Sequence, residues 1–310
     1  MTRFIHELKK AELHVHLEGS VEPETLRELD PSLDDATLCA LYNYTDFLGF
    51  LRSYKAINLR LATPEHFALI TRRLLERLER ENVRYAEVNL SVGMWLWREL
   101  EFEPYFNAIA AEAARSPVEV RYIFDAVRQF GAEAGWEVAR LAAEQRERGV
   151  LGIGIGGDEA KGPAKDFRQI FAWAQTQGLH VAPHAGEVLG PQSVWDALEC
   201  GAERIGHGVR SIEDPALVRH LASHRIPLEV CISSNVRTGA VASLAEHPVR
   251  RLFDAGVPVT LNTDDPPMFG TTLEREYRIA ADEFGFREDE LRAVARNGFE
   301  FAFDKCAERD

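Results

Sequence analysis

Two histidines stand at alternate positions in His14-Val15-His16, inside a short run of strand-forming residues. Side chains two positions apart in a strand point to the same face, so the two imidazoles converge if this run is a strand. A converging pair either chelates a metal ion or forms hydrogen bonds in a polar interior. The His-x-His spacing alone leaves these two readings equally open.

Further titratable residues follow later strand-like runs, in His184-Ala185-Gly186-Glu187, Gly206-His207-Gly208 and Asp264-Asp265-Pro266. In a parallel α/β barrel the C-terminal ends of all strands face one mouth, so these side chains would gather there. Buried titratable groups are costly unless they are paired or bind a metal. This pattern favours a functional site over a structural cluster.

The residue types in this group suit a catalytic zinc centre, with one Zn²⁺ per chain. Imidazole and carboxylate ligands hold such an ion while one position stays open for water, whose pKa falls toward neutrality. Glu187 is a candidate to shuttle protons, and His207 and Asp265 are candidates to hold the hydroxide. The predicted metal ligands are His14, His16, His184 and Asp264.

Strand-like runs alternate with segments of helical periodicity along the whole chain, and there are about as many runs as the eight strands of a closed barrel. We therefore predict an α/β fold, a TIM-type (β/α)8 barrel that forms a single domain over residues 1–310. The predicted strands are residues 11–17, 83–91, 118–127, 151–157, 179–186, 204–208, 227–234 and 258–265.

The connection between residue 21 and about residue 82 is unusually long and contains only helix-like segments. An insertion after the first strand of a barrel falls over the mouth, where catalytic loops lie. We predict that it is a helical lid that influences the choice of substrate.

Composition narrows the function further. The formal net charge is −14 and no cluster of Lys and Arg stands out, which argues against a nucleic-acid partner. The charged N-terminus and the lack of a long apolar run argue against export and a membrane role. The scattered cysteines Cys39, Cys200, Cys231 and Cys306 indicate reduced thiols and a cytoplasmic protein. A small molecule is the expected partner, and homo-oligomerisation stays open.

Seven motifs follow one another in the order of a known family: KAELHVHLEGS, NVRYAEV, GGDE, HAGE, ERIGHGV, SSNVRTGAV and NTDDPPMFG. This set resembles the adenosine deaminase branch of the amidohydrolase superfamily across nearly the whole chain. The resemblance implies that Glu187 protonates purine N1, that His207 orients and deprotonates the attacking water, and that Asp265 holds the same hydroxide or a ring nitrogen. It also implies that Gly157 offers a backbone amide to the purine.

One position departs from the family pattern. Glu18 stands where adenosine deaminases have the Asp that meets the ribose 5′-hydroxyl. Glu18 is therefore the predicted substrate contact on the 5′ side, and the group that the substrate carries there stays open. Adenine deaminases share this Glu but lack the GGDE stretch. The DDPPMFG ending and HAGEVLGPQSVWDAL look similar to bacterial 6-aminodeoxyfutalosine deaminases of a menaquinone pathway, whereas SSNVRTGAV resembles adenosine deaminases equally well. Adenosine and 6-aminodeoxyfutalosine are therefore both expected substrates, with adenine as the alternative.

Aminodeoxyfutalosine carries a carboxylated aromatic group beyond the ribose, which calls for a cation and apolar surface near the lid. Arg52 and Lys55, or Arg98 beside Trp95 and Trp97, are candidates, although charged residues on helices are usually only solvated. Ser233-Ser234-Asn235 either contacts substrate or supports the metal shell. Surface or core roles are expected for His66, His180, His220, His224 and His247.

Three other readings fit less well. A two-metal lactonase or peptidase would need a bridging carboxylate or a modified lysine, and residues 151–157 and 179–187 offer no Lys. The cytidine-type deaminase signature with P-C-x-x-C is absent. A non-catalytic barrel would have lost a ligand or an acid, and all of these positions are filled.

Overall fold

The computed structural model of the protein describes residues 1–304, and Cys306 lies outside them. The described cysteines Cys39, Cys200 and Cys231 are free thiols. The strands form two parallel sheets, ordered β1-β2-β3-β4-β5 and β6-β7-β8-β9. Their bounds are β1 Lys10–His16, β2 Val83–Leu90, β3 Glu119–Val127, β4 Val150–Gly156, β5 His180–Val181, β6 His184–Ala185, β7 Ile205–His207, β8 Leu228–Val230 and β9 Val259–Leu261.

Backbone hydrogen bonds join the two sheets at both ends. On one side His16 N donates to Asp264 O at 2.8 Å, and Asp264 N donates to His14 O at 3.0 Å. On the other side Ala182 N donates to Ile153 O at 3.1 Å, and Gly206 N donates to Pro183 O at 3.0 Å. The predicted α/β barrel is confirmed. Its fifth strand is split into β5 and β6 around Pro183, which has no N–H to continue the ladder.

The seventh predicted strand, 227–234, was too long. β8 ends at Val230, and Asn235 N donates to Cys231 O at 2.9 Å to close the first turn of α12. Ser233, Ser234 and Asn235 therefore lie on a short helix at the mouth of the barrel. The last predicted strand, 258–265, is also shorter, because β9 ends at Leu261 and Asn262 turns its side-chain oxygen to the backbone N of Leu13 at 2.9 Å.

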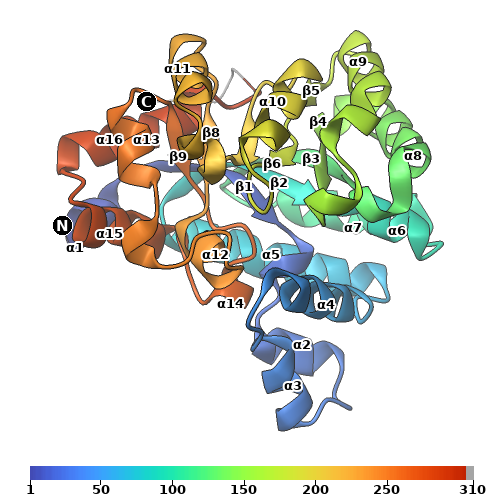
Figure 1. Ribbon diagram of the computed structural model, residues 1–310. Coiled ribbons are helices and arrows are strands. Elements are labelled where there is room, and N and C mark those ends of the chain that lie inside the picture. Colours follow the sequence, from blue (N-terminus) through green and yellow to red (C-terminus); the bar gives the residue numbers. More distant parts are fainter. Residues whose placement is uncertain (305–310) are drawn as a thin grey trace.

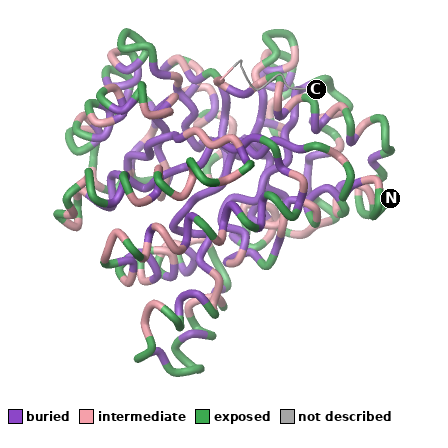
Figure 2. The backbone as a smooth tube through the Cα atoms, turned by 180° about the vertical axis from the view of Figure 1, so that it is seen from behind, coloured by how far each residue is buried: buried purple, intermediate pink, exposed green. Residues whose placement is uncertain are grey.

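Helices surround the strands, and the buried part of the chain follows the strands while the outer helix faces are exposed (Figures 1 and 2). The helices are α1 Thr2–Glu7, α2 Pro23–Leu29, α3 Asp35–Leu41, α4 Phe47–Asn58, α5 Pro64–Arg80, α6 Val92–Trp97, α7 Phe102–Ala113, α8 Gly131–Glu144, α9 Arg168–Thr176, α10 Pro191–Glu199, α11 Pro215–Ser223, α12 Ile232–Arg237, α13 Val249–Asp254, α14 Pro266–Phe269, α15 Leu273–Phe284 and α16 Glu288–Glu300.

The long connection after β1 consists of helices, as predicted, with α2, α3 and α4 preceding α5. In Figure 1 α2 and α3 project below the barrel, and α4 lies between them and the strands. The side chain of Asp46 caps α4 by accepting a hydrogen bond from Gly49 N at 2.6 Å. Phe50 and Ile57 are buried on the inner face of this helix, which fixes the helix against the rest of the molecule.

Candidate active site

The four residues predicted to bind metal come together at the C-terminal ends of the strands. His14 and His16 belong to β1, His184 belongs to β6, and Asp264 follows β9; all four are buried. One potential ligand atom from each lies within 4.8 Å of the others. Segments that are 250 residues apart in the sequence therefore supply one cluster of nitrogen and oxygen donors, because β1 and the end of β9 are neighbours.

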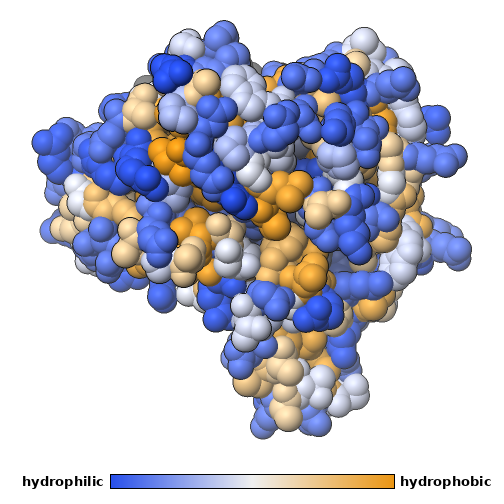
Figure 3. All heavy atoms as spheres, in the orientation of Figure 1, coloured by the Kyte–Doolittle hydropathy of each residue, from blue (hydrophilic) through white to orange (hydrophobic). Residues whose placement is uncertain are grey.

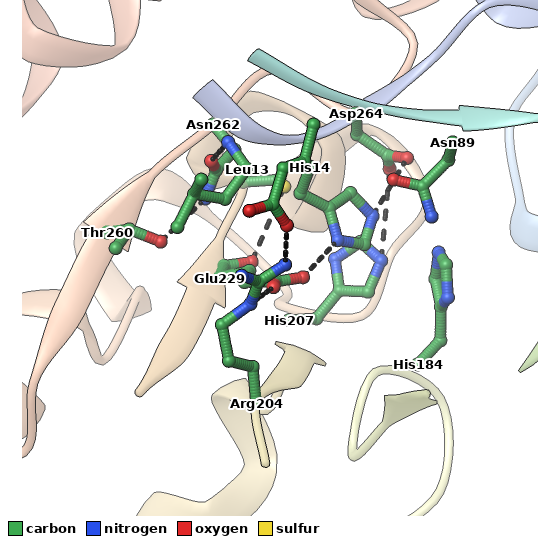
Figure 4. A network of polar contacts seen from close by, with 12 residues as sticks. Leu13, His14, Asn89, His184, Arg204, His207, Glu229, Thr260, Asn262 and Asp264 are labelled. Atoms are coloured by element: carbon green, nitrogen blue, oxygen red, sulfur yellow. Dashed lines mark hydrogen bonds and ion pairs between the residues drawn. The ribbon is translucent and has the colours of Figure 1, made fainter. Parts of the chain in front are cut away.

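The donor atoms are arranged as a cation would require. His14 Nδ1 lies 2.8 Å from Glu229 Oε2, while His14 Nε2 has no hydrogen-bond partner in residues 1–304 and faces Asp264 Oδ1 at 3.6 Å. His16 Nε2 and His184 Nε2 lie only 3.1 Å apart. Figure 4 shows His14 between Glu229 and Asp264. A buried unpartnered nitrogen beside converging imidazoles and a carboxylate fits a divalent ion of the zinc type.

A second layer of polar side chains orients these groups. Asp125 Oδ2 lies 3.5 Å from His16 Nδ1 and accepts a hydrogen bond from Asn89 at 2.9 Å. Ser234 donates to Asp264 Oδ2 at 2.6 Å. Such contacts fix the tautomer and the direction of metal ligands. Asp125, Asn89 and Glu229 were not predicted from the sequence, although the first two also lie near the ends of strands.

The three predicted catalytic residues line the same pocket as His16, His184 and Asp264 of the donor cluster. His207 Nε2 lies 3.7 Å from Glu187 Oε2 and 3.9 Å from Asp264 Oδ2. Burial, together with the negative charge of Asp264, raises the pKa of Glu187 and that of Asp265 well above their usual ranges. Burial lowers the pKa of His207 to about 3. Glu187 and Asp265 therefore bind a proton more tightly than ordinary carboxyl groups, and the imidazole beside them is neutral.

Of the residues predicted to bind substrate, Gly157 and Asp265 line the pocket and Glu18 does not. Gly157 has a φ of +95°, a backbone conformation that favours glycine, and a Cβ there would lie 2.2 Å from the side-chain oxygen Oε1 of Gln129. Glu18 is buried beneath the pocket wall, where its Oε1 accepts from Trp95 Nε1 at 2.7 Å and from Ser91 N at 3.1 Å. Burial raises the pKa of Glu18 to about 7.

The pocket, about 370 Å³ in volume, continues from this cluster to α4. Its outer wall includes Phe47, Leu48 and Leu51 of α4 together with three cations, Arg52, Lys55 and Lys161. Within residues 1–304 none of these cations pairs with a carboxylate. In Figure 3 apolar residues gather near the centre of an otherwise hydrophilic face, above the helical projection.

The Arg98 alternative was wrong. Arg98 donates to Asn58 O at 2.7 Å and to Leu61 O at 3.0 Å, so its guanidinium secures the end of α4 and does not face the pocket. Trp95 is buried and bound to Glu18. Trp97 is partly exposed and lies 4.4 Å beneath Lys55 Nζ, which brings it close to the rim.

Ser233, Ser234 and Asn235 differ in what their side chains contact. Ser234 bonds to the predicted ligand Asp264, and Asn235 bonds to His207 at 3.1 Å. Ser233 instead bonds to Thr271 and Glu276. Ser234 and Asn235 therefore help to hold Asp264 and His207 in place, whereas Ser233 contacts neither of them.

None of the helices within residues 1–304 combines the length and the apolar composition that a membrane span needs.

Comparison with known proteins agrees with this site. Residues 9–310 match the family model described as adenosine deaminase. The chain is 43% identical to the aminodeoxyfutalosine deaminase of Streptomyces avermitilis, over 97% of this chain and 88% of that protein. It is similar to the crystal structure of an adenine deaminase from Arthrobacter aurescens, with a TM-score of 0.90, 30% identity, and 97% and 96% of the two chains covered.

An amidohydrolase from Burkholderia ambifaria with bound Zn is similar as well, with a TM-score of 0.91, 25% identity, and 99% of this chain and 89% of that chain covered. The family match over residues 9–310 covers all the strands of the barrel and all four residues of the donor cluster. This protein belongs to the adenosine deaminase family and is a hydrolytic deaminase.

Proposed function

We propose that this deaminase removes the 6-amino group of a purine nucleoside that carries an anionic 5′ substituent, with 6-aminodeoxyfutalosine as the candidate substrate. The observation that carries the proposal is a single pocket in which a buried acid and base cluster leads outward to Arg52, Lys55 and Lys161. Cations at the rim complement a carboxylate on the far end of the substrate. The aminodeoxyfutalosine deaminase relative at 43% identity supports the same substrate.

The metal centre in this proposal holds one Zn²⁺ on His14, His16, His184 and Asp264, whose donor atoms converge. When bound, such an ion lowers the pKa of a water molecule toward 7 and so supplies a nucleophile at neutral pH. Glu229, Asp125 and Ser234 hold the ligands in place through the hydrogen bonds and contacts described above.

The protein side chains then divide the proton transfers between them. Glu187 carries a proton because its pKa is raised, and it donates this proton to N1 of the purine as the attacking oxygen bonds to C6. His207 and Asp265 orient the attacking water and accept its proton. The proton taken from the water then passes to the exocyclic nitrogen, and cleavage of the bond between C6 and this nitrogen releases ammonia. The proton of the C6 hydroxyl returns to Glu187, which leaves a 6-oxopurine.

Substrate recognition in this proposal begins at the purine and extends to α4. The backbone N–H of Gly157 and the carboxyl group of Asp265 contact the ring, and Glu18 shapes the wall near the ribose through Ser91, which lines the pocket. A free adenine base would leave the apolar wall formed by Phe47, Leu48 and Leu51 without a contact. A pocket of this volume and lining suits a larger ligand.

The test is turnover of 6-aminodeoxyfutalosine, adenosine and adenine in parallel, followed as loss of 6-aminopurine absorbance on protein of known metal content. A clear preference for aminodeoxyfutalosine is expected. A preference for adenosine would assign the enzyme to purine salvage and remove the anionic substituent from the proposal. A preference for adenine would reject the nucleoside, and no turnover of any of the three would reject the proposed reaction.

A further inference from the structure

A chain of buried hydrogen bonds leads from His207 away from the pocket. His207 Nδ1 lies 3.1 Å from Asn235 Nδ2, and Asn235 Oδ1 lies 3.2 Å from His247 Nε2. The other ring nitrogen of His247, Nδ1, accepts the backbone N–H of Val249 at 3.2 Å. All three side chains are at most 3% exposed, so their polar atoms depend on one another for hydrogen bonds.

The backbone amide of Val249 determines which atom is the donor in each hydrogen bond of this chain. A backbone N–H only donates, so Nδ1 of His247 must carry a lone pair. Burial lowers the pKa of His247 to about 3, and the neutral ring therefore has its single proton on Nε2. That N–H donates to Asn235 Oδ1, which turns the amide NH₂ of Asn235 toward His207.

The same reasoning applies one step further along the chain. Asn235 Nδ2 donates to Nδ1 of His207, so this nitrogen must be bare. A doubly protonated His207 would point its Nδ1–H at the hydrogens of the amide. The side chain of Asn235 cannot swing away easily, because its backbone is held on both sides: Asn235 N donates to Cys231 O at 2.9 Å, and Val241 N donates to Asn235 O at 2.8 Å.

We infer that Asn235 and His247 are positioning residues that keep His207 neutral with its one proton on Nε2, the nitrogen that faces Glu187 and Asp264. This nitrogen lies 3.7 Å from Glu187 Oε2 and 3.9 Å from Asp264 Oδ2. Sequence reasoning gave His247 only a surface or core role. The structure assigns it control over the tautomer of a histidine in the pocket.

The consequence for the reaction rests on the proposed function. A ring with its proton already on Nε2 donates a hydrogen bond to the oxygen of the attacking water and takes no proton there. Of the two groups proposed to accept the proton of the water, Asp265 is then the acceptor: its carboxylate gains the proton as the oxygen bonds to C6. His207 orients the oxygen without changing its own protonation state.

The direct test is the ring ¹⁵N spectrum of the metal-loaded protein labelled on histidine, because protonated and bare ring nitrogens have well separated shifts. His207→Gln identifies the signals of His207 by their loss. The expected result is a bare Nδ1 and a protonated Nε2. A proton on Nδ1 of wild-type His207 overturns the inference, whether or not any variant folds. No turnover is needed, so this result is independent of the proposed substrate.

Two variants extend the test to catalysis. Asn235→Asp places an acceptor beside His207 Nδ1 and should move the proton to that nitrogen, with kcat reduced about tenfold or more and KM changed much less. His247→Gln keeps an N–H donor toward Asn235 Oδ1 and should keep both the tautomer and kcat within about threefold. His66→Gln is the matched control, since His66 also contacts a backbone N–H, that of Ala62 at 3.3 Å, but lies outside the pocket.

The outcomes separate the two proposals. A reversed tautomer with unchanged kcat in Asn235→Asp would contradict the donor role of His207. The expected tautomer in a wild-type protein that deaminates no purine would reject the proposed function and leave the positioning role of Asn235 and His247 intact.

Discussion

Two residues of the site, His207 and Asp264, hold backbone conformations with φ of 60° and 63°. Residues other than glycine rarely adopt this left-handed region, at a cost of about 1–3 kcal/mol each. The hydrogen bonds from Asn235 to His207 and from Ser234 to Asp264 hold both side chains in place. The backbone strain therefore lies at the two positions, His207 and Asp264, where the chain turns at the end of a strand and the side chain faces the pocket.

Ser234 is predicted to matter for metal affinity although it is not a proposed ligand. Ser234→Ala removes the 2.6 Å hydrogen bond to Asp264 Oδ2 and should weaken metal binding about 10–100-fold. Competition with a chromogenic chelator measures this affinity. Ser223→Ala, on the exposed end of α11, should leave it unchanged. Equal metal affinities of Ser234→Ala and wild type would show that Ser234 does not support metal binding.

Glu187 is predicted to supply the proton to the purine. Glu187→Gln keeps the shape of the side chain but cannot give up a proton, so kcat should fall about 10²–10⁴-fold while metal content stays constant. Steady-state kinetics with metal analysis checks both. Glu81→Gln is the control, because Glu81 is also buried and accepts the backbone N–H of Glu274 at 2.8 Å, outside the pocket. A loss of less than about threefold in Glu187→Gln would rule out general acid catalysis by this residue.

The histidines and carboxylates of the candidate site could be predicted from the sequence, because such residues at the ends of strand-like runs seldom serve the fold alone. Their supporting partners could not. Glu229 lies within an apolar strand and meets His14 only through the order of strands in the barrel. His247 and Asn235 meet through the fold of the segment between them, which no periodicity predicts.

At the level of elements, α4 is predicted to determine the preference for an anionic substrate. Replacing Arg52 and Lys55 together with Ala should raise KM for aminodeoxyfutalosine about tenfold or more, since a hydrogen bond to a charged group contributes about 1.5–3 kcal/mol. Activity on adenosine should change little, because adenosine presents no charge to this wall. Arg72→Ala, on the exposed face of α5, is the control. Equal losses on both substrates would contradict specific recognition of the anion.

The loop after β6, which carries Glu187, is held by one carboxylate from the GGDE motif. Glu159 accepts from Gly186 N at 2.8 Å, Val188 N at 2.6 Å and Leu189 N at 2.7 Å, and from Ser193 Oγ at 2.7 Å. Glu159→Gln puts an NH₂ group against these donors. Amide hydrogen exchange in residues 186–189 should become faster.

This change in Glu159 should also lower kcat about 10–100-fold, because displacement of a reacting group by about 1 Å has effects of this size. Ser193→Ala, which removes one of the four donors and no backbone contact, should have a much smaller effect. Unchanged exchange in Glu159→Gln would show that the loop is held by other contacts.

The order and type of the elements could be predicted from hydrophobic periodicity, whereas some of their ends could not. Residues 227–234 were predicted as one strand because strand-forming residues continue to Ile232. The pairing of β8 with β9 ends at Val230, however, and α12 begins at Ile232. The predicted strand 179–186 is divided at Pro183, and only the backbone bonds of Ala182 and the Pro183 carbonyl show that the barrel continues there.

At the level of the whole molecule, a buried charge network joins the opposite end of the barrel to the site. Arg204 contacts Glu87 and Glu229, the latter at 2.6 Å, and donates to Phe301 O at 2.9 Å. Figure 4 shows Arg204 below Glu229, which in turn reaches His14. Burial raises the pKa of Glu229, but the charges and hydrogen bonds of Arg204 and His14 together outweigh burial and leave this pKa below its ordinary value.

Arg204→Met is predicted to lower the free energy of unfolding by about 3–5 kcal/mol at neutral pH, because it leaves buried carboxylates without a counter-charge. Their folded-state pKa values would then exceed the unfolded ones, so stability would fall as pH rises from the unfolded pKa to the higher folded pKa. The variant should therefore regain stability between pH 8 and pH 5 relative to wild type. Denaturant unfolding at both pH values measures this, and a constant difference would contradict it.

The positions of the proposed metal ligands also bear on the order of events during synthesis. His14 leaves the ribosome 250 residues before Asp264. Domains begin to fold while translation proceeds, but the nascent protein has only part of its donor set until Asp264, after β9, pairs with Val15 of β1. An ion that needs all four proposed ligands would therefore bind only after the two ends of the barrel have met, so the metal-loaded site would be completed late in the maturation of the protein.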